Sequence, residues 1–218
     1  KEFEFVFSKY IKRKNVFAVS SAASALEIIS ILLNIKKGDE VIIPAHTYCA
    51  SAIPFARQGA KIIWSDINFN TRVVDIEDIK KKITSKTKAI VIVHLYGYAC
   101  DFRKIINFCK KKNIKIVEDC AQSLGAEISG KKVGTLGDFA CYSFHAQKNI
   151  TTLGEGGMLY VQKNGLASIL VYKTDNNMQY GSIILDEDQT IINICPSSSS
   201  NSEKENCVCL GKKSHTDF

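Results

Sequence analysis

The chain has 218 residues and a formal net charge of +7, with 45% hydrophobic and 23% charged residues. This composition is typical of a soluble globular protein with one domain of ordinary size or slightly more. It excludes an integral membrane protein, because no apolar run approaches the ~18 residues that a membrane-spanning helix needs, and no recognised motif accompanies the lysines to indicate a nucleic-acid partner.

Short apolar runs alternate with amphipathic segments between about residues 16 and 161. In chain order, the predicted helices are 22–34, 49–58, 75–83 and 101–112. The predicted strands are 40–44, 61–64, 89–93, 114–117, 139–143 and 157–161. Most of these strands are apolar throughout, as parallel strands covered on both faces are. The alternation therefore predicts an α/β fold with a mostly parallel central sheet and helices on both faces.

Polar and aromatic side chains gather at the ends of these strands. In open α/β sheets, ligands bind beyond the carboxyl ends of the strands. The residues expected at this edge are Tyr48, His94, Glu118, Asp119, Ser143, His145 and Lys148. The small-residue run "SSAAS" at 20–24 precedes the first predicted helix, and the free N–H groups of a helix start favour an anion. A lysine, a carboxylate and a phosphate site are the groups that pyridoxal phosphate needs.

Three stretches carry a family resemblance: "SSAASALEIISILLNIKKGDEVIIPAHTYCASA", "IVEDCAQSLGA" and "SFHAQKNITTLGEGGM". They occur in family order, and the last two form a highly specific pair. On these motifs the sequence resembles the DegT/DnrJ/EryC1/StrS family of sugar aminotransferases. The resemblance covers roughly residues 16–162 and implies the fold type I, aspartate aminotransferase-like architecture.

The resemblance implies the chemical roles of three residues. Lys148 matches the lysine that forms the internal aldimine with pyridoxal phosphate and later moves a proton at the substrate carbon. Asp119 matches the carboxylate that pairs with the protonated pyridine nitrogen, and Gln122 matches the residue that bonds the phenolic oxygen. Without the rest of the motif, Asp119 would more simply be interpreted as a helix cap and Lys148 as a surface lysine.

The resemblance also assigns the phosphate site and the ring platform. Ser143 matches the hydroxyl that binds the phosphate, together with backbone N–H groups near Ala22 and Ala23. Tyr48 matches the aromatic residue that stacks on the cofactor ring, with ordinary core packing as the alternative. Family members usually carry Ser-Gly-Thr where this chain has Ser21-Ala22-Ala23, so Ala22 is expected to be strained if its position needs a positive φ.

Three further residues near the motifs receive no firm catalytic role. For His94 and His145, a structural histidine is at least as plausible as a catalytic one, and Glu118 is expected to be structural. Five of the eight cysteines (Cys49, Cys100, Cys109, Cys120 and Cys141) are scattered through apolar or helical patterns. That distribution favours reduced thiols in a cytoplasmic protein over a secreted disulfide framework.

The chain is expected to consist of a pyridoxal-phosphate-binding large domain at 1–162, incomplete at its N-terminal segment, and an atypical, partly disordered tail at 163–218. The C-terminal small domain of the family is expected to be missing or atypical. The tail has a strand-like piece at 182–194 and a serine run at 197–200 that reads as linker or disorder. Cys195, Cys207, Cys209 and His215 do not have the spacing of a standard zinc finger, so no metal site is expected.

Two functions from different classes remain open. The first is a pyridoxal-phosphate-dependent transaminase that moves an amino group from glutamate to a keto group of a nucleotide-linked sugar, as a cytoplasmic homodimer in polysaccharide or lipopolysaccharide biosynthesis. The second is a non-catalytic, truncated remnant that keeps the large-domain fold and at most binds cofactor or a full-length partner. A dehydratase is disfavoured, because the dehydratases of the family generally replace the lysine at position 148 by histidine.

Overall fold

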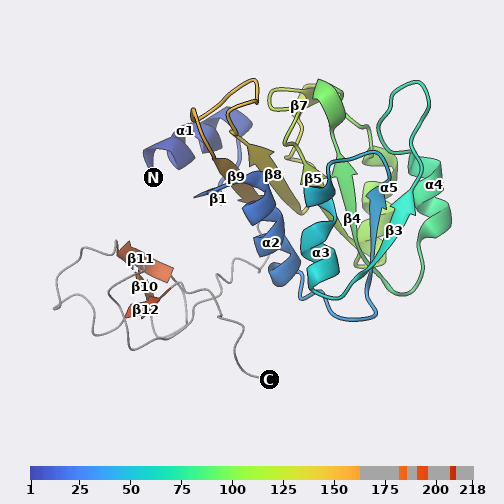
Figure 1. The fold of residues 1–218 in the computed structure, drawn as a ribbon, viewed down its shortest axis with the longest axis horizontal. Coiled ribbons are helices and arrows are strands. Elements are labelled where there is room, and N and C mark those ends of the chain that lie inside the picture. The colour runs from blue at the N-terminus through green and yellow to red at the C-terminus, as the bar shows by residue number, and fades with distance from the viewer. Residues whose placement is uncertain (163–181, 186–190, 196–206, 210–218) are drawn as a thin grey trace. The chain divides into compact units, whose positions relative to one another are not determined.

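The computed structural model describes residues 1–162, 182–185, 191–195 and 207–209 (Figure 1). The chain divides into two compact units, Lys1–Ala167 and Ser168–Phe218. The helices of the first unit are α1 (Glu2–Ile11), α2 (Ala22–Leu32), α3 (Ile53–Arg57), α4 (Ile76–Lys82) and α5 (Arg103–Lys111), with 3-10 helices η1 (Cys49–Ser51) and η2 (Leu95–Gly97). Its strands are β1 (Val16–Val19), β2 (Glu40–Pro44), β3 (Lys61–Ser65), β4 (Thr87–Val93), β5 (Lys115–Asp119), β6 (Glu127–Ile128), β7 (Lys131–Lys132), β8 (Phe139–Ser143) and β9 (Gly157–Val161).

Seven of these strands form one sheet in the order β1-β9-β8-β5-β4-β2-β3. The pairs β8–β5, β5–β4, β4–β2 and β2–β3 are parallel, whereas β9 runs antiparallel to both β1 and β8. The predicted α/β fold with a mostly parallel sheet is therefore confirmed. All six predicted strands are present, and β2, β8 and β9 have the predicted bounds.

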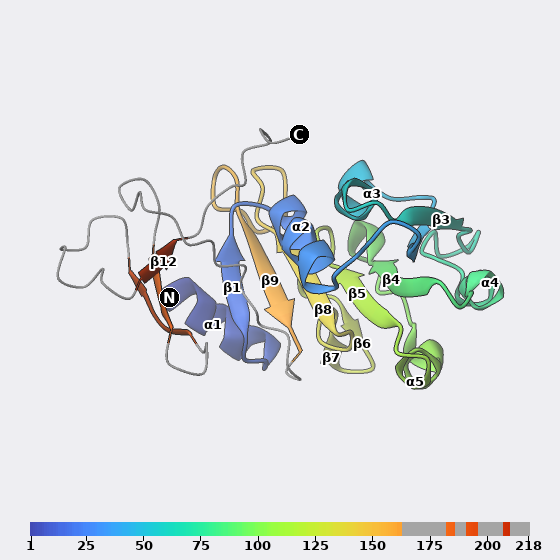
Figure 2. The same ribbon diagram turned by 90° about the horizontal axis from the view of Figure 1, so that it is seen from below.

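Helices cover both faces of this sheet. Figure 2 shows α2 and α3 on one side and α1 and α5 on the other. The central strands β2, β4, β5 and β8 are buried almost throughout, which explains why their sequences are apolar at consecutive positions. Within the described residues, no helix is long and apolar enough to cross a membrane.

Two sequence-based assignments need correction. The helix predicted at 49–58 is two short elements, η1 and α3, separated at Ala52. Pro54 lies in the first turn of α3, where its missing N–H costs no helical hydrogen bond. The prediction also missed α1 and β1, which precede the first predicted helix.

The second unit contains β10 (Ser182–Leu185), β11 (Ile191–Cys195) and β12 (Cys207–Cys209), which form a three-stranded antiparallel sheet in the order β11-β10-β12. The strand-like piece expected at 182–194 is thus two strands. The serine run at 197–200 and His215 lie outside the described residues.

Candidate active site

A pocket of about 460 Å³ lies between the start of α2 and the carboxyl ends of β5 and β8. It is lined by all seven residues that the sequence assigned to a site: Ala22, Ala23, Tyr48, Asp119, Gln122, Ser143 and Lys148. They come from the start of α2, the segment after β2, the end of β5 and the end of β8. Thr47, Ser51, Gln147 and Glu155 also line the pocket and were not predicted from the sequence. His145, which was expected at this edge without a firm role, lines it as well.

Asp119 and Glu118 are neighbours in β5 but point to opposite faces of the sheet, because side chains alternate along a strand. Asp119 faces the pocket and is 6% exposed. Its Oδ2 accepts a hydrogen bond from Ser51 Oγ at 2.7 Å, and its Oδ1 accepts one from the N–H of Ala121 at 3.1 Å. Both donors are neutral, and no cation among the described residues forms an ion pair with this carboxylate. A buried carboxylate of this kind is suited to a cationic ligand.

Lys148 lies in the segment that follows β8, five residues after Ser143. Its backbone N–H donates to the carbonyl of His145 at 2.9 Å, which closes a turn and directs the segment along the pocket. Within residues 1–162, no carboxylate forms an ion pair with Lys148 Nζ. The amine of Lys148 therefore has no ion-pair partner among the described residues and is available to a ligand in the pocket.

The start of α2 offers two free backbone donors to the same pocket. Ser21 caps the helix by accepting the N–H of Ser24 at 3.0 Å, and its carbonyl accepts the N–H of Ala25 at 3.1 Å. The N–H groups of Ala22 and Ala23 have no acceptor among the described residues. Neither alanine has a positive φ, because α2 begins at Ala22. The backbone strain that was considered for an alanine in place of the usual glycine at position 22 is therefore absent. Both N–H groups are available to an anion at the positive end of an 11-residue helix.

Gly157 packs directly against this helix start. A Cβ at Gly157 would lie 2.4 Å from the carbonyl carbon of Ser21 and 2.7 Å from the nitrogen of Ala22. The last glycine of "GEGG" therefore allows β9 to approach the anion-binding turn.

Replacing Gly157 by alanine is expected to displace the N–H groups of the turn, because the nearest atoms belong to backbone. We expect pyridoxal phosphate to bind about tenfold more weakly, in line with the 1–3 kcal/mol that overpacking costs. Gly154→Ala is the matched control in the same motif, since its Cβ would have no neighbour within 4 Å. Titration of both variants with cofactor checks this, and equal affinities would contradict the role of the close approach.

The hydroxyl of Ser143 keeps its proton for a ligand. Ser143 Oγ accepts the backbone N–H of His145 at 3.3 Å, so it acts there as an acceptor only. Gln122 is oriented in a similar way, because its Oε1 accepts the backbone N–H of Tyr96 at 3.3 Å and both Nε2 protons remain free. Tyr48 is 70% exposed, so its ring is accessible at the pocket instead of packed into the core.

His145 is held at the pocket by two contacts. Its Nδ1 accepts the N–H of Gln147 at 3.2 Å, and its Nε2 lies 3.4 Å from Glu155 Oε1. Glu155 belongs to the "GEGG" turn, and the sequence predicted no role for it. The structure thus pairs a histidine with a carboxylate in the pocket that Lys148 also lines, and the spacing of the motif alone did not predict this pair.

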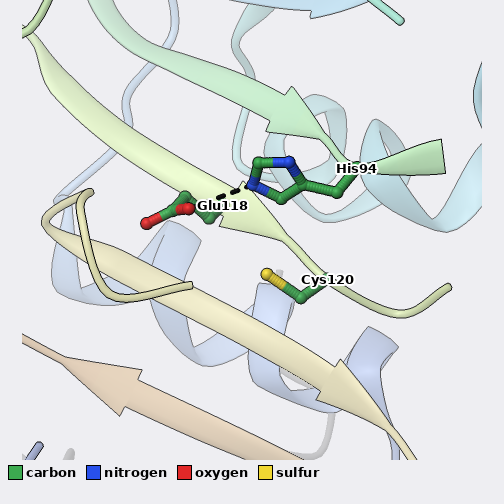
Figure 3. A group of neighbouring side chains, drawn as sticks. All are labelled: His94, Glu118 and Cys120. Atoms are coloured by element: carbon green, nitrogen blue, oxygen red, sulfur yellow. Dashed lines mark hydrogen bonds and ion pairs between the residues drawn. The ribbon is translucent and has the colours of Figure 1, made fainter. Parts of the chain in front are cut away.

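His94, Glu118 and Cys120 form a buried cluster (Figure 3). Its Glu118 side chain lies on the opposite face of the sheet from Asp119, because side chains alternate along β5. Glu118 accepts hydrogen bonds from the N–H groups of Gly134, Leu136 and Gly137 at 2.6–2.8 Å, and His94 Nε2 lies 3.0 Å from it. His94 Nδ1 accepts the N–H of Cys100, so Nε2 carries the proton and donates to Glu118.

This cluster has no lone pairs arranged for a metal ion, although its three residue types are common ligands. Both nitrogens of His94 and both oxygens of Glu118 are already used in hydrogen bonds. Burial, followed by the charge of Glu118, raises the pKa of the Cys120 thiol well above its usual value. A protonated thiol is a poor ligand. Glu118 therefore holds the loop at 133–137 to β5, and His94 links Glu118 to the backbone of Cys100.

Cys141 lies beside Asp119 in the neighbouring strand β8. Burial is the main cause that raises the pKa of its thiol well above the usual range, and the negative charge of Asp119 adds to it. Cys141 is therefore an uncharged neighbour that leaves the charge of Asp119 uncompensated.

Comparisons with known proteins agree with this geometry. A model of the DegT/DnrJ/EryC1/StrS aminotransferase family matches residues 1–179. A GDP-perosamine synthase of Vibrio cholerae is 41% identical over 157 residues, which are 72% of this chain and 42% of the relative. A dTDP-3-amino-3,6-dideoxy-alpha-D-galactopyranose transaminase of Aneurinibacillus thermoaerophilus is 43% identical, over 78% of this chain and 47% of the relative. The chain thus spans less than half the length of these two relatives.

One solved structure shows a similar fold with the cofactor present. It is the Escherichia coli GDP-4-keto-6-deoxy-D-mannose-3-dehydratase with bound hydrated pyridoxal phosphate. It superposes with a TM-score of 0.72 and 31% identity, over 78% of this chain and 45% of that one. The expected aspartate aminotransferase-like architecture is confirmed for the large domain by this similarity.

Proposed function

Because this chain belongs to the DegT/DnrJ/EryC1/StrS aminotransferase family, we propose that it binds pyridoxal phosphate and transfers an amino group from glutamate to a keto group of a nucleotide-linked sugar. The similarity to a GDP-perosamine synthase and a dTDP-sugar transaminase supports this substrate class. The proposal places the cofactor in residues 1–162, with 163–218 as an atypical tail. A cytoplasmic homodimer in surface polysaccharide synthesis is part of the same proposal.

The observation that carries the proposal is the buried carboxylate of Asp119, which no described cation pairs with, in one pocket with an uncommitted lysine. A protonated pyridine nitrogen would supply the missing positive charge, and the carboxylate would in turn keep that proton on the ring. The free N–H groups of Ala22 and Ala23, with the hydroxyl of Ser143, suit a phosphate. The residues present therefore fit this cofactor.

Pyridoxal phosphate, when bound, supplies an electron sink for the negative charge that forms when the substrate carbon loses a proton. The chain supplies the base and the orientation. Lys148 Nζ accepts that proton as a neutral amine and returns one as an ammonium group. Asp119 would hold the pyridine nitrogen of the cofactor, and the N–H groups at the start of α2 would hold its phosphate. Tyr48 would lie against the ring and exclude water there.

The direct test is the absorbance of the purified protein with added pyridoxal phosphate, before and after glutamate. We expect a band near ~420 nm from cofactor joined to a lysine, and its shift to ~330 nm on accepting the amino group. Lys112→Ala, at the residue that caps the C-terminus of α5, serves as a control that leaves both bands unchanged. Nucleotide-linked keto sugars that restore the first band would then identify the acceptor.

The remnant hypothesis makes the opposite prediction. It expects a band that does not respond to glutamate, or no band at all. The first outcome would leave a cofactor-binding protein without amino transfer, and the second would remove the cofactor site itself.

A further inference from the structure

Ser51 is a buried hydroxyl that the reaction outlined above does not use. It lies at the end of η1, is 1% exposed and donates to Asp119 Oδ2 at 2.7 Å. This is among the shorter hydrogen bonds to a side chain in the pocket, and its acceptor is charged. Hydrogen bonds to charged groups are roughly twice as strong as neutral ones.

The number of hydroxyl protons determines which group donates in each of the two hydrogen bonds of Ser51. Ser51 Oγ also lies 2.8 Å from Thr47 Oγ1. Ser51 has one hydroxyl proton, and a carboxylate only accepts, so this proton points to Asp119. Thr47 must then be the donor to Ser51. The three groups form a one-way relay from Thr47 through Ser51 to Asp119.

The hydrogen bonds to Asp119 hold the plane of its carboxylate in one orientation. Ser51 holds Oδ2 while the N–H of Ala121 holds Oδ1, so rotation of the carboxyl group breaks at least one bond. Each oxygen keeps one further lone pair for a ligand. Because both donors are neutral, the full negative charge stays available in the pocket.

The relay also joins the carboxylate to the aromatic residue. Thr47 and Ser51 flank Tyr48, and the N–H of Ser51 donates to the Tyr48 carbonyl at 3.0 Å. One turn of chain thus carries both the ring at the pocket and the hydroxyl on Asp119. A shift of this turn would move both together.

We infer that Ser51 is a positioning residue that fixes Asp119 against the nitrogen of a bound pyridine ring, with Thr47 orienting the Ser51 hydroxyl. The inference rests on the proposed cofactor and adds the residues that hold its carboxylate partner. Neither hydroxyl takes part in the proposed proton transfer, so we expect the loss of affinity in Ser51→Ala to depend on the Asp119 carboxylate.

The test is a double-mutant cycle on the dissociation constant for pyridoxal phosphate, measured by spectral titration. Ser51→Ala is expected to weaken binding about tenfold in the wild-type background, as the loss of one hydrogen bond to a charged group implies. In the Asp119→Ala background the same change is expected to weaken binding by less than about twofold, since the transmitting carboxylate is gone. Thr47→Val should weaken binding by about two- to threefold, because Ser51 keeps its bond to Asp119.

Two comparisons separate a positioning role from a structural one. Ser51→Thr keeps the hydroxyl and should restore most of the affinity that Ser51→Ala loses. The melting temperature of each apoprotein shows whether the turn itself has been damaged. An equal loss of affinity in both Asp119 backgrounds, or unchanged affinity in Ser51→Ala and Thr47→Val together, would overturn the inference. Absence of cofactor binding in the wild type would instead overturn the proposed function.

Discussion

Replacing Lys148 by alanine is expected to lower the rate of amino transfer from glutamate by about 10⁴-fold, because proton transfer by a positioned base contributes up to that factor. Lys148 is the only lysine lining the pocket formed by the described residues, and no described carboxylate ties up its Nζ. No other amine in the described pocket can take over. Stopped-flow absorbance after mixing with glutamate measures the rate of the half-reaction.

Lys148→Arg is the informative companion variant. Arginine keeps the positive charge and much of the length but stays protonated at all accessible pH values, so it cannot accept a proton. We expect Lys148→Arg to be nearly as inactive as Lys148→Ala. If Lys148→Arg retained more than about a tenth of the wild-type rate, charge and not proton transfer would be the role of Lys148.

Replacing Glu118 by glutamine is expected to destabilise the first unit by about 3 kcal/mol, since unsatisfied buried donors cost about 1–3 kcal/mol each. The four groups around Glu118 are all donors: three backbone N–H groups and His94 Nε2. A glutamine has one acceptor oxygen and presents an NH₂ group to the remaining donors. His94 cannot switch tautomer to help, because Cys100 already donates to its Nδ1.

Thermal unfolding followed by circular dichroism measures this effect. A loss of 3 kcal/mol corresponds to a melting temperature lower by about 10 °C for a domain of this size. Glu127→Gln is the control with the same chemical change, because Glu127 forms an exposed ion pair with Lys132 at 3.2 Å. Exposed pairs contribute less than about 1 kcal/mol. Equal shifts in both variants would refute the structural role of Glu118.

The residues of the proposed site are more conspicuous in the sequence than the first two elements of the fold. In "EFEFVF", phenylalanines at 3, 5 and 7 recur at every second position as in a strand, yet the segment is α1. Tertiary packing decides: the Phe7 ring lies 4.9 Å from Tyr142 and 5.7 Å from Phe144. Ile11, one turn further on, is also buried. No local pattern contains those partners, because they come from β8 and the residue after it.

Ser51 shows the same limit within the site. The motif identified Asp119, since its position after an apolar strand is visible in the sequence. Ser51 was placed inside a helix predicted at 49–58, where a serine has no particular meaning. The role proposed for Ser51 follows only from the structure, in which η1 brings the hydroxyl to a carboxylate 68 residues away.

The pairing of β1 with β9 has a consequence for the order of folding. Val16 lies opposite Tyr160 and Val19 opposite Gly157, so this edge of the sheet joins residues about 140 positions apart, and such long-range contacts form late. During synthesis, the first turn of α2 leaves the ribosome long before the strand that packs against it. The nascent chain therefore carries the start of α2 without its packing partner, and an unpaired β8 edge, until β9 has been made. We therefore expect pyridoxal phosphate to bind only after β1 and β9 have paired. Cofactor binding would then follow the folding of this edge and would not direct it.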